Sequence, residues 1–397
     1  MYRLRNVLFL QIVALILICL SSGKLYAADT QMVTLAVVPF HNVCGDVEWD
    51  WVGYGFAETL STKLANVSSI TLVERLRLDD AIKELKLQSS GLCDEKRAAQ
   101  LGKMVGAQFV IIGSYQRCGG LIKADARKVD VTTGTVSNGV DAVGPVDRVF
   151  DVESALASKV VKSLDGGMIY TNAEDVIPRD NGSSTAYEYS SRGYREYQLG
   201  RADKAIEYMD KAIQSDPNYA QAYFYKGLIY QILRRDYDRA ISNFDKAIEL
   251  RPNNVEYRLT RGNAYDSGKH IVTMALADYD KVIEMNPRYA AGYMLRGKAY
   301  QRTHEDSEKA LEDYYKALEV NPRNPMLHFL IAETFSHRPE PDLRRAVAEY
   351  STAVDLDPGF VEAYDKRASA YYKMGRMYLA MKDWQKRDQI RLSRRRR

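Results

Sequence analysis

A repeated phrase that ends in proline is the feature that most constrains this chain. Pro217, Pro252, Pro287, Pro322 and Pro358 lie 35, 35, 35 and 36 residues apart. They close five similar segments: DKAIQSDP, DKAIELRP, DKVIEMNP, YKALEVNP and STAVDLDP. A self-similar period of this length is typical of helical repeat arrays, in which each unit buries its apolar face only against its neighbours. The second half of the chain is therefore predicted to be a stack of helix pairs that holds another molecule.

Small and aromatic residues recur with the same period. One column of small residues falls where the two helices of a unit must approach closely: Gly193, Gly227, Gly262, Gly297, Ala332 and Ala368. A second small column serves the facing helix: Ala205, Ala240, Ala275, Ala310, Ala346 and Ala380. An aromatic column follows one turn after the first: Tyr230, Tyr265, Tyr300, Phe335 and Tyr371. We interpret the aromatic column as core between stacked units, with Glu196 in its place in the first unit.

A basic column stands just before the first small column. Its members are Arg192, Lys226, Arg261, Arg296 and Arg367. A continuous basic stripe could bind an acidic ligand, but Asp278, Asp313 and Asp383 on the second helices are placed to face it. Desolvated arginines normally need partners, so we favour structural ion pairs. The fifth unit breaks the pattern, because Ile331 replaces the arginine while Glu349 remains.

The amino terminus reads as an export signal. Arg3 and Arg5 precede an apolar run over residues 7–20, and Ala27 offers a small residue for cleavage. Fourteen residues suit a signal peptide and are short for a spanning helix, which needs roughly 20. We predict a signal peptide over 1–27, cleaved after Ala27 or Ala28, and a periplasmic or cell-envelope location. A retained anchor is the alternative, and it also places the body outside the cytoplasm.

Residues 28–165 are predicted to form a compact α/β domain. Apolar β-branched runs indicate strands over 33–40, 70–73, 108–115 and 122–131. Fourfold apolar spacing indicates helices over 51–66, 78–87, 94–105 and 149–164. A turn at Thr132-Thr133-Gly134 leads into a fifth strand before the last helix, so the expected order is β-α-β-α-α-β-β-β-α.

This part resembles a known family. The stretch AVVPFHNVCGDVEWDWVGYGFAETLSTKL is similar to the opening of curli-secretion (CsgG-type) and TolB amino-terminal-type domains, and VERLRLDDAIKELKLQSSGLCDEKRAAQLGKMVGAQFVIIGSY continues the resemblance over 33–165. Such domains occur in bacterial envelope proteins. Curli-secretion channels are lipoproteins with long membrane hairpins. Leu17 and Ile18 before Cys19 do not suit a lipoprotein site, and no alternating segment pair suits a membrane hairpin. The resemblance therefore implies the fold and the envelope setting, and not a pore.

From residue 185 the chain resembles tetratricopeptide repeats (TPRs). First helices read YFYKGLIY, YRLTRGNAY, YMLRGKAY and YDKRASAYY. We expect a linker over 166–184, about six TPR units over 185–392 and a basic tail over 393–397. The predicted fold is α+β overall: an amino-terminal α/β domain followed by an all-α TPR solenoid.

In this family the first helices line the inner, concave face, which implies a partner-binding groove. Mapped onto this chain, the groove residues are Phe224, Leu228, Gln231, Leu259, Asn263, Asp266, Met294, Lys298, Gln301, Phe329 and Glu333. Their mixture of apolar and polar types suits an extended peptide or a partner helix. Chaperone-binding members clamp a peptide carboxylate with lysine and asparagine at set positions, and the corresponding places here hold Phe224 and Leu228, and Leu259 and Asn263. That clamp is absent, so capture of a carboxylate is not supported.

The chain offers little for catalysis. Five scattered histidines form no metal motif, and no phosphate-binding loop or nucleophile elbow occurs. Cys44, Cys93 and Cys118 leave open one disulfide with one free thiol, or three half-buried thiols. Beyond the leader the body is acidic, while the last 16 residues carry eight basic and two acidic side chains, which argues against a nucleic-acid binder. No cofactor or metal is expected.

These observations predict a non-enzymatic scaffold or adaptor in envelope assembly or secretion, which binds protein partners through the groove. A structural subunit that oligomerises at the outer membrane is one alternative. A regulatory domain that binds a small ligand in the α/β part is another. The basic tail is either a solvated end or a contact with an anionic envelope surface.

Overall fold

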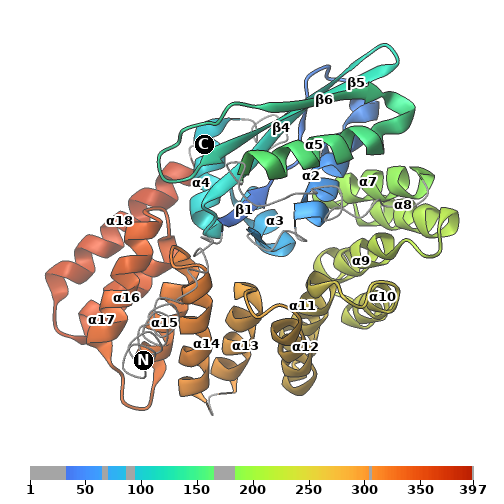
Figure 1. Cartoon of the computed structure of the whole chain (residues 1–397). Coiled ribbons are helices and arrows are strands. Elements are labelled where there is room, and N and C mark those ends of the chain that lie inside the picture. Colours follow the sequence, from blue (N-terminus) through green and yellow to red (C-terminus); the bar gives the residue numbers. More distant parts are fainter. Residues whose placement is uncertain (1–32, 65–69, 86–93, 165–183, 304–305, 396–397) are drawn as a thin grey trace, which may run out of the picture.

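The computed structural model describes residues 33–64, 70–85, 94–164, 184–303 and 306–395. Figure 1 shows a sheet with helices on it, in blue to green, seated against an arc of paired helices that runs from yellow-green to red. The predicted signal peptide, almost all of the predicted linker and the last two residues of the tail lie outside the described residues. An α/β part followed by a TPR-like solenoid confirms the predicted fold class.

One mixed sheet forms the centre of the amino-terminal part. Its strands are β1 (Val33–Val37), β2 (His41–Asn42), β3 (Ile70–Leu72), β4 (Phe109–Cys118), β5 (Leu121–Asp130) and β6 (Val140–Pro145). The strand order is β3-β1-β4-β5-β6, with β2 beside β4. Pairs β1/β3 and β1/β4 are parallel, whereas β4/β5 and β5/β6 are antiparallel. The predicted order of elements is confirmed, apart from the two-residue strand β2, which is too short to leave a periodic pattern.

Helices cover both faces of the sheet. They are α2 (Trp51–Leu64), α3 (Arg75–Glu84), α4 (Glu95–Val105) and α5 (Val149–Leu164), with the short turns η1 (Val47–Trp49) and η3 (Val146–Arg148) before α2 and α5. Alternate residues of β4 face opposite layers, because side chains alternate along a strand. Ile111 and Tyr115 join the core under α2 and α5, while Val110 and Ile112 join the core under α3 and α4.

Six helix pairs follow. The first helices are α7 (Ser184–Gln198), α9 (Ala220–Leu228), α11 (Val255–Asn263), α13 (Ala290–Arg302), α15 (Pro325–His337) and α17 (Val361–Lys373). The second helices are α8 (Ala202–Ser215), α10 (Tyr237–Leu250), α12 (Val272–Met285), α14 (Ser307–Val320), α16 (Leu343–Leu356) and α18 (Met377–Arg395).

The first small column brings the two helices of a unit together, as predicted. A Cβ atom on Gly227 would lie 2.5 Å from the Phe244 ring, and one on Gly297 would lie 2.7 Å from the Tyr314 ring. In the second, third and fourth units the aromatic side chains without exposed surface lie on the second helices. Phe244, Tyr279 and Tyr314 are completely buried, whereas Tyr230 and its counterparts in the first helices are half-buried, except Phe335.

Two units accommodate their 35-residue spacing with a wider turn. The first helices α9 and α11 continue as π-helical turns η4 (Ile229–Arg234) and η5 (Ala264–Lys269). A π-helical turn takes up more residues than an α-helical turn. Each ends at a residue with positive φ, Arg235 at 54° and His270 at 57°, which reverses the chain into the second helix.

Four members of the basic column, Lys226, Arg261, Arg296 and Arg367, form a ladder of ion pairs with the second helices, which confirms the structural interpretation, while Arg192 pairs with Glu188 on its own helix. The Arg296 guanidinium donates to both Asp313 oxygens at 2.8 and 2.7 Å and to Asp280 of the preceding second helix at 2.6 Å. Arg261 makes the same contacts with Asp278 and Asp245. The ladder therefore connects one helix pair to the next.

The fifth and sixth units also pair a basic side chain of the first helix with a carboxylate of the second helix. Arg367 pairs with Asp383 at 2.7 Å. In the fifth unit, where the arginine is missing, Glu349 lies 2.7 Å from the Nδ1 atom of His328. A histidine thus fills the gap that Ile331 leaves in the basic column.

Candidate functional site

The amino-terminal part packs directly on the first helices, and this junction is the most elaborate site in the described residues. Helix α2 lies against α7, where Trp51 meets Tyr187 edge to face with ring centroids 6.2 Å apart, and Tyr54 meets Tyr194 at 5.5 Å. A Cβ atom on Gly55 would overlap the Tyr187 hydroxyl, so glycine permits this approach. One continuous apolar core runs from the sheet into the array.

A group of charged and phenolic side chains lies in the middle of the junction. We call it the junction cluster: Glu58, Arg75, Asp79, Tyr194, Tyr225 and Glu256. Arg75 donates to Glu58 at 2.7 Å, and its guanidinium lies over the Tyr194 ring, 5.4 Å from the centroid. The Tyr194 hydroxyl donates to Asp79 at 2.9 Å. Tyr225 donates to Glu58 across the junction.

The junction cluster holds three carboxyl groups and one arginine in a desolvated setting. Arg75 is 7% exposed and Asp79 is 1% exposed. Burial raises the pKa of Asp79 to about 6, although Arg75 opposes the shift. Burial also raises the pKa of Glu256 to about 7 and raises the pKa of Glu58. The cluster is therefore a place where protonation and domain packing are coupled.

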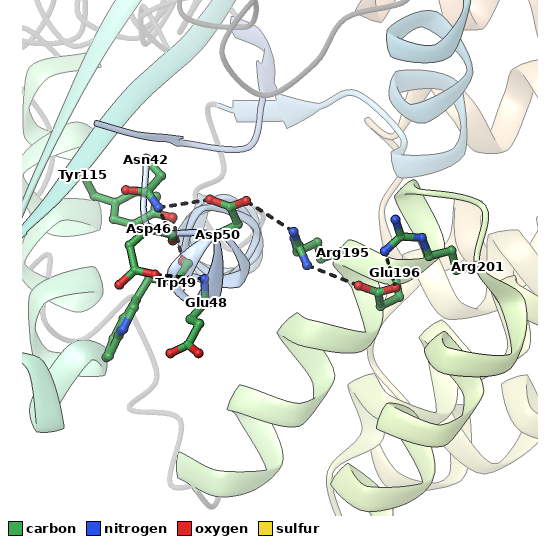
Figure 2. A network of polar contacts seen from close by, with 9 residues as sticks. All are labelled: Asn42, Asp46, Glu48, Trp49, Asp50, Tyr115, Arg195, Glu196 and Arg201. Carbon is green, nitrogen blue, oxygen red and sulfur yellow. Dashed lines mark hydrogen bonds and ion pairs between the residues drawn. The ribbon is translucent and has the colours of Figure 1, made fainter. Parts of the chain in front are cut away.

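A second polar network extends the junction towards solvent, and Figure 2 shows its members. Asp50 accepts from Asn42 at 3.0 Å and from Arg195 of α7 at 3.3 Å. Arg195 also donates to Glu196 at 3.2 Å, and Glu196 accepts from Arg201 at 3.2 Å. Asp50 thus has a structural role, as an ion-pair partner of the array.

The amino-terminal part touches the array again near its carboxyl end. Arg77 of α3 donates to the Asn324 side chain at 2.8 Å, and Asn321 donates to the carbonyl of Gly106 at 3.1 Å. Gly106 ends α4 with φ at 68°, and a Cβ atom there would lie 3.0 Å from Asn324. Contacts from α7 to α15 therefore span five of the six units.

The structure divides the predicted groove residues into two groups. Six are buried: Phe224, Leu228, Gln231, Leu259, Asp266 and Met294. The Phe224 ring stacks on Tyr257 with centroids 4.7 Å apart, so it packs between units. The other five reach water to different degrees: Asn263, Lys298, Gln301, Phe329 and Glu333. We call these five the open groove, and its role in binding remains a prediction.

Lys298 is exposed, whereas the other four open-groove residues are half-buried. Desolvation lowers the pKa of its ammonium, opposed by Glu74 of the amino-terminal part. Glu74 and Arg77 line a small hollow of about 20 Å³ together with Met294. The amino-terminal part therefore lies beside α13, close to Lys298.

The sequence does not reveal the junction. Gly53-Tyr54-Gly55 carries no recognisable motif there, and Glu74-Arg75 stands out only as part of the family resemblance. One signal is present: Glu196 breaks the aromatic column in the first unit, and it is this residue that joins Arg195 in the second network.

No group of three or more histidine, cysteine or acidic residues within the described residues could hold a metal ion. None of the helices within the described ranges combines the length and the apolar character needed to cross a membrane. Cys44 and Cys118 are exposed free thiols, while Cys93 lies outside the described residues.

Comparisons with known proteins identify both parts. Residues 23–118 match the family "Curli production assembly/transport component CsgG". Residues 191–254 and 290–324 match two tetratricopeptide-repeat families. A curated relative, "Putative adenylate cyclase 3" of Rhizobium meliloti (strain 1021), is 22% identical over 193 residues, which is 48% of this chain and 31% of the relative. The chain thus spans less than a third of that relative's length.

Solved structures share the paired-helix fold. TTC0263, a TPR protein of Thermus thermophilus, is 23% identical and covers 47% of this chain and 99% of its own, with a TM-score of 0.40. PilW, described as a type IV pilus biogenesis factor, is 16% identical and covers 51% of this chain and 91% of its own, with a TM-score of 0.46. The family matches thus identify a CsgG-type stretch over residues 23–118 and tetratricopeptide repeats over residues 191–254 and 290–324.

Proposed function

We propose that this protein is a non-enzymatic envelope scaffold that binds a protein partner in the open groove. The observation that carries the proposal is the division of the inner face. The junction occupies the inner side of the first units, and the packing between units buries the apolar groove residues. Lys298, Gln301, Phe329 and Glu333 stay accessible on α13 and α15.

The chemistry of the open groove favours an extended segment or a helix with both apolar and polar side chains. Phe329 offers a partly accessible ring beside Phe360, with centroids 5.1 Å apart. Glu333 accepts from Lys366 at 2.8 Å, so it presents a charge that is already oriented. Such a mixed surface suits helix-in-groove or extended-peptide recognition.

An envelope role is supported by the CsgG-type match over residues 23–118 and by the predicted export signal. We propose that the partner belongs to a system for envelope assembly or secretion. In this proposal the CsgG-type domain and the first units of the array form one rigid body, because the junction buries one shared core.

Crosslinking in intact cells tests the open groove. A photoreactive residue placed at Lys298 or Gln301 is expected to capture a defined partner. The matched control is Lys281, an exposed lysine on the second helix α12 that pairs with Glu284. The same partner should be lost from the double variant Lys298→Glu/Phe329→Ser, with helicity unchanged by circular dichroism. Unaltered capture by that folded variant would disprove the groove assignment.

A second candidate is a ligand-binding regulatory module. Its support is the 193-residue match to a protein named as a cyclase, which covers about half of this chain. A hollow of about 310 Å³ on the open side of β4, β5 and β6 offers a place for a small polar ligand, with Gln116, Lys123 and Asp125 on its walls. Thermal stabilisation by a metabolite, lost in Asp125→Ala, would support this role. If no metabolite in a broad panel stabilises the protein, the ligand-binding role is contradicted and protein binding remains the proposed function.

A further inference from the structure

Helix α18 ends the array and exposes an apolar stripe. Met377, Tyr378, Met381 and Leu392 are 50, 80, 53 and 55% exposed. They lie on the side of the helix opposite Ala380 and Asp383, which are buried against α17. Met377, Tyr378 and Met381 share the first turns of the helix, and Leu392 lies on the same face about 22 Å from Met377, beyond the exposed Gln385 and Asp388. The last helix of a solenoid normally has a polar outer face, so this stripe needs an explanation.

The same helix carries exposed cations that form no salt bridge. Of its two acidic residues, Asp383 pairs with Arg367 of α17, and the exposed Asp388 pairs with its neighbour Arg387 on α18 itself. Lys382, Lys386 and Arg391 are exposed, and none of them forms a salt bridge with a carboxylate among the described residues.

On earlier second helices several exposed lysines pair with nearby carboxylates, as in Lys211–Glu207, Lys246–Glu249, Lys281–Glu284 and Lys309–Asp306. Lys204 of α8 and Lys316 of α14 are exposed without a salt bridge among the described residues, but each is the one such lysine on its helix, whereas α18 carries three such cations. The sequence continues this charge with four arginines at 394–397.

We propose that the outer face of α18 docks on an anionic membrane surface. Lys382 and Lys386 flank the apolar stripe on one side and Arg391 on the other, by their positions on the helix. A helix with this arrangement lies in the plane of the interface, with apolar side chains among the acyl chains and cations at the headgroups. The attraction to anionic lipid adds up over successive cations and is weakened by salt. This docking is independent of what the open groove binds.

Vesicle flotation with the full chain tests the proposal. The probes are vesicles of phosphatidylglycerol and phosphatidylcholine in equal parts, and vesicles of phosphatidylcholine alone. The measured quantity is the ratio of bound protein on the two, at low and at high salt. The leader is present in every variant, so it contributes equally to each ratio. We expect a ratio above about tenfold for the unaltered chain at low salt, and a clear decrease at high salt.

Two sets of substitutions separate the stripe from the cations. Tyr378→Ser/Met381→Ser removes exposed apolar groups, and Lys382→Gln/Lys386→Gln/Arg391→Gln removes exposed charges. Matched controls on other second helices are Met274→Ser/Tyr315→Ser, which are also exposed, and Lys246→Gln/Lys281→Gln. Each α18 set should lower the ratio at least about fivefold, and the controls should leave it unchanged.

Several outcomes would overturn the proposal. A ratio near one for the unaltered chain excludes anionic docking. A ratio that the Tyr378→Ser/Met381→Ser variant retains in full excludes insertion of the stripe, and leaves only attraction by the tail. A chain that ignores vesicles but self-associates in light scattering, and becomes monomeric in the same variant, assigns the stripe to a protein contact instead.

Discussion

Two regions of this protein place an arginine among carboxylates, and they do so in opposite ways. In the ladder, Arg296 contacts Asp313 and Asp280 along the array, and the guanidinium keeps about a fifth of its surface exposed. In the junction cluster, Arg75 is almost fully buried and faces Glu58, Asp79 and Glu256. The ladder repeats with the units, whereas the junction cluster occurs once.

The difference shows how charge compensation sets the response to pH. In the ladder the strongest bonds run between Arg296 and a pair of well-placed aspartates, and they raise the pKa of the guanidinium. In the junction one arginine serves three carboxyl groups, so burial dominates and raises their pKa values. The array is therefore held by fixed ion pairs, and the junction is held by a group that titrates near neutral pH.

Removal of the junction arginine should have the largest effect. Arg75→Met leaves three buried carboxyl groups without a cation, and the expected loss of unfolding free energy is about 3–5 kcal/mol at pH 8. The fluorescence of Trp49 and Trp51 during urea unfolding reports on the junction, in a Trp384→Phe background. Arg97→Met, an exposed arginine in α4, is the control. A loss equal to that of the control would mean that Arg75 does not hold the junction.

Breaking one rung of the ladder should cost less. Arg296→Leu leaves Asp313 buried without its partner, with an expected loss of about 2 kcal/mol because part of the site reaches water. Arg296→Leu/Asp313→Leu should recover stability to within about 1 kcal/mol of the unaltered chain. Circular dichroism during urea unfolding measures both. If the double variant is less stable than the single one, the ladder contributes more than charge compensation.

The smallest effect is on how the unfolding free energy depends on pH, which should run opposite to that of a salt-bridged carboxylate with a lowered pKa. The pKa of Asp79 in the folded protein, about 6, lies above its ordinary value of 3.8, so the folded state takes up a proton first. Stability should therefore rise as the pH falls from about 8 through 6, and the rise should end near 4. Asp79→Asn should stabilise the protein by about 1–2 kcal/mol at pH 8 and by about half as much at pH 5.

Glu256→Gln should act in the same direction, with its midpoint near pH 7. Asp94→Asn, an exposed cap of α4, is the control for a carboxylate without junction contacts. Urea midpoints from pH 8 to pH 5 measure the effect. A flat profile for the unaltered chain would show that the junction carboxyl groups do not titrate in this range.

Much of the fold could be predicted because it depends on periodicity. The proline spacing and the small columns predict the helix pairs. The two helices of a unit can approach this closely only where the first helix carries a small residue, as at Gly227 and Gly297. The partners of the basic column could also be predicted, because a desolvated arginine needs a carboxylate within reach and the second helices supply aspartates at the matching positions. The π-helical turns before Arg235 and His270 could not be predicted, because one extra residue has several structural solutions.

The junction could not be predicted because its residues are distant in the sequence. Tyr194 lies 115 residues from Asp79, and Tyr225 lies 167 residues from Glu58. Periodicity describes contacts between neighbouring units and carries no information about a domain that folds back on them. For the same reason the repeat pattern predicts the apolar groove residues, Phe224 and Leu259 among them, on an accessible face, and the structure buries them.

The contact between Gly106 and Asn324 has a mechanical consequence. A helical solenoid is ordinarily a spring, because each unit is held only by its neighbours and small rotations add along its length. Here the CsgG-type domain is fastened to α7 at one end and to the start of α15 at the other. The domain therefore connects the first unit to the fifth across the arc. This connection fixes the curvature of the first five units and leaves the sixth free to bend.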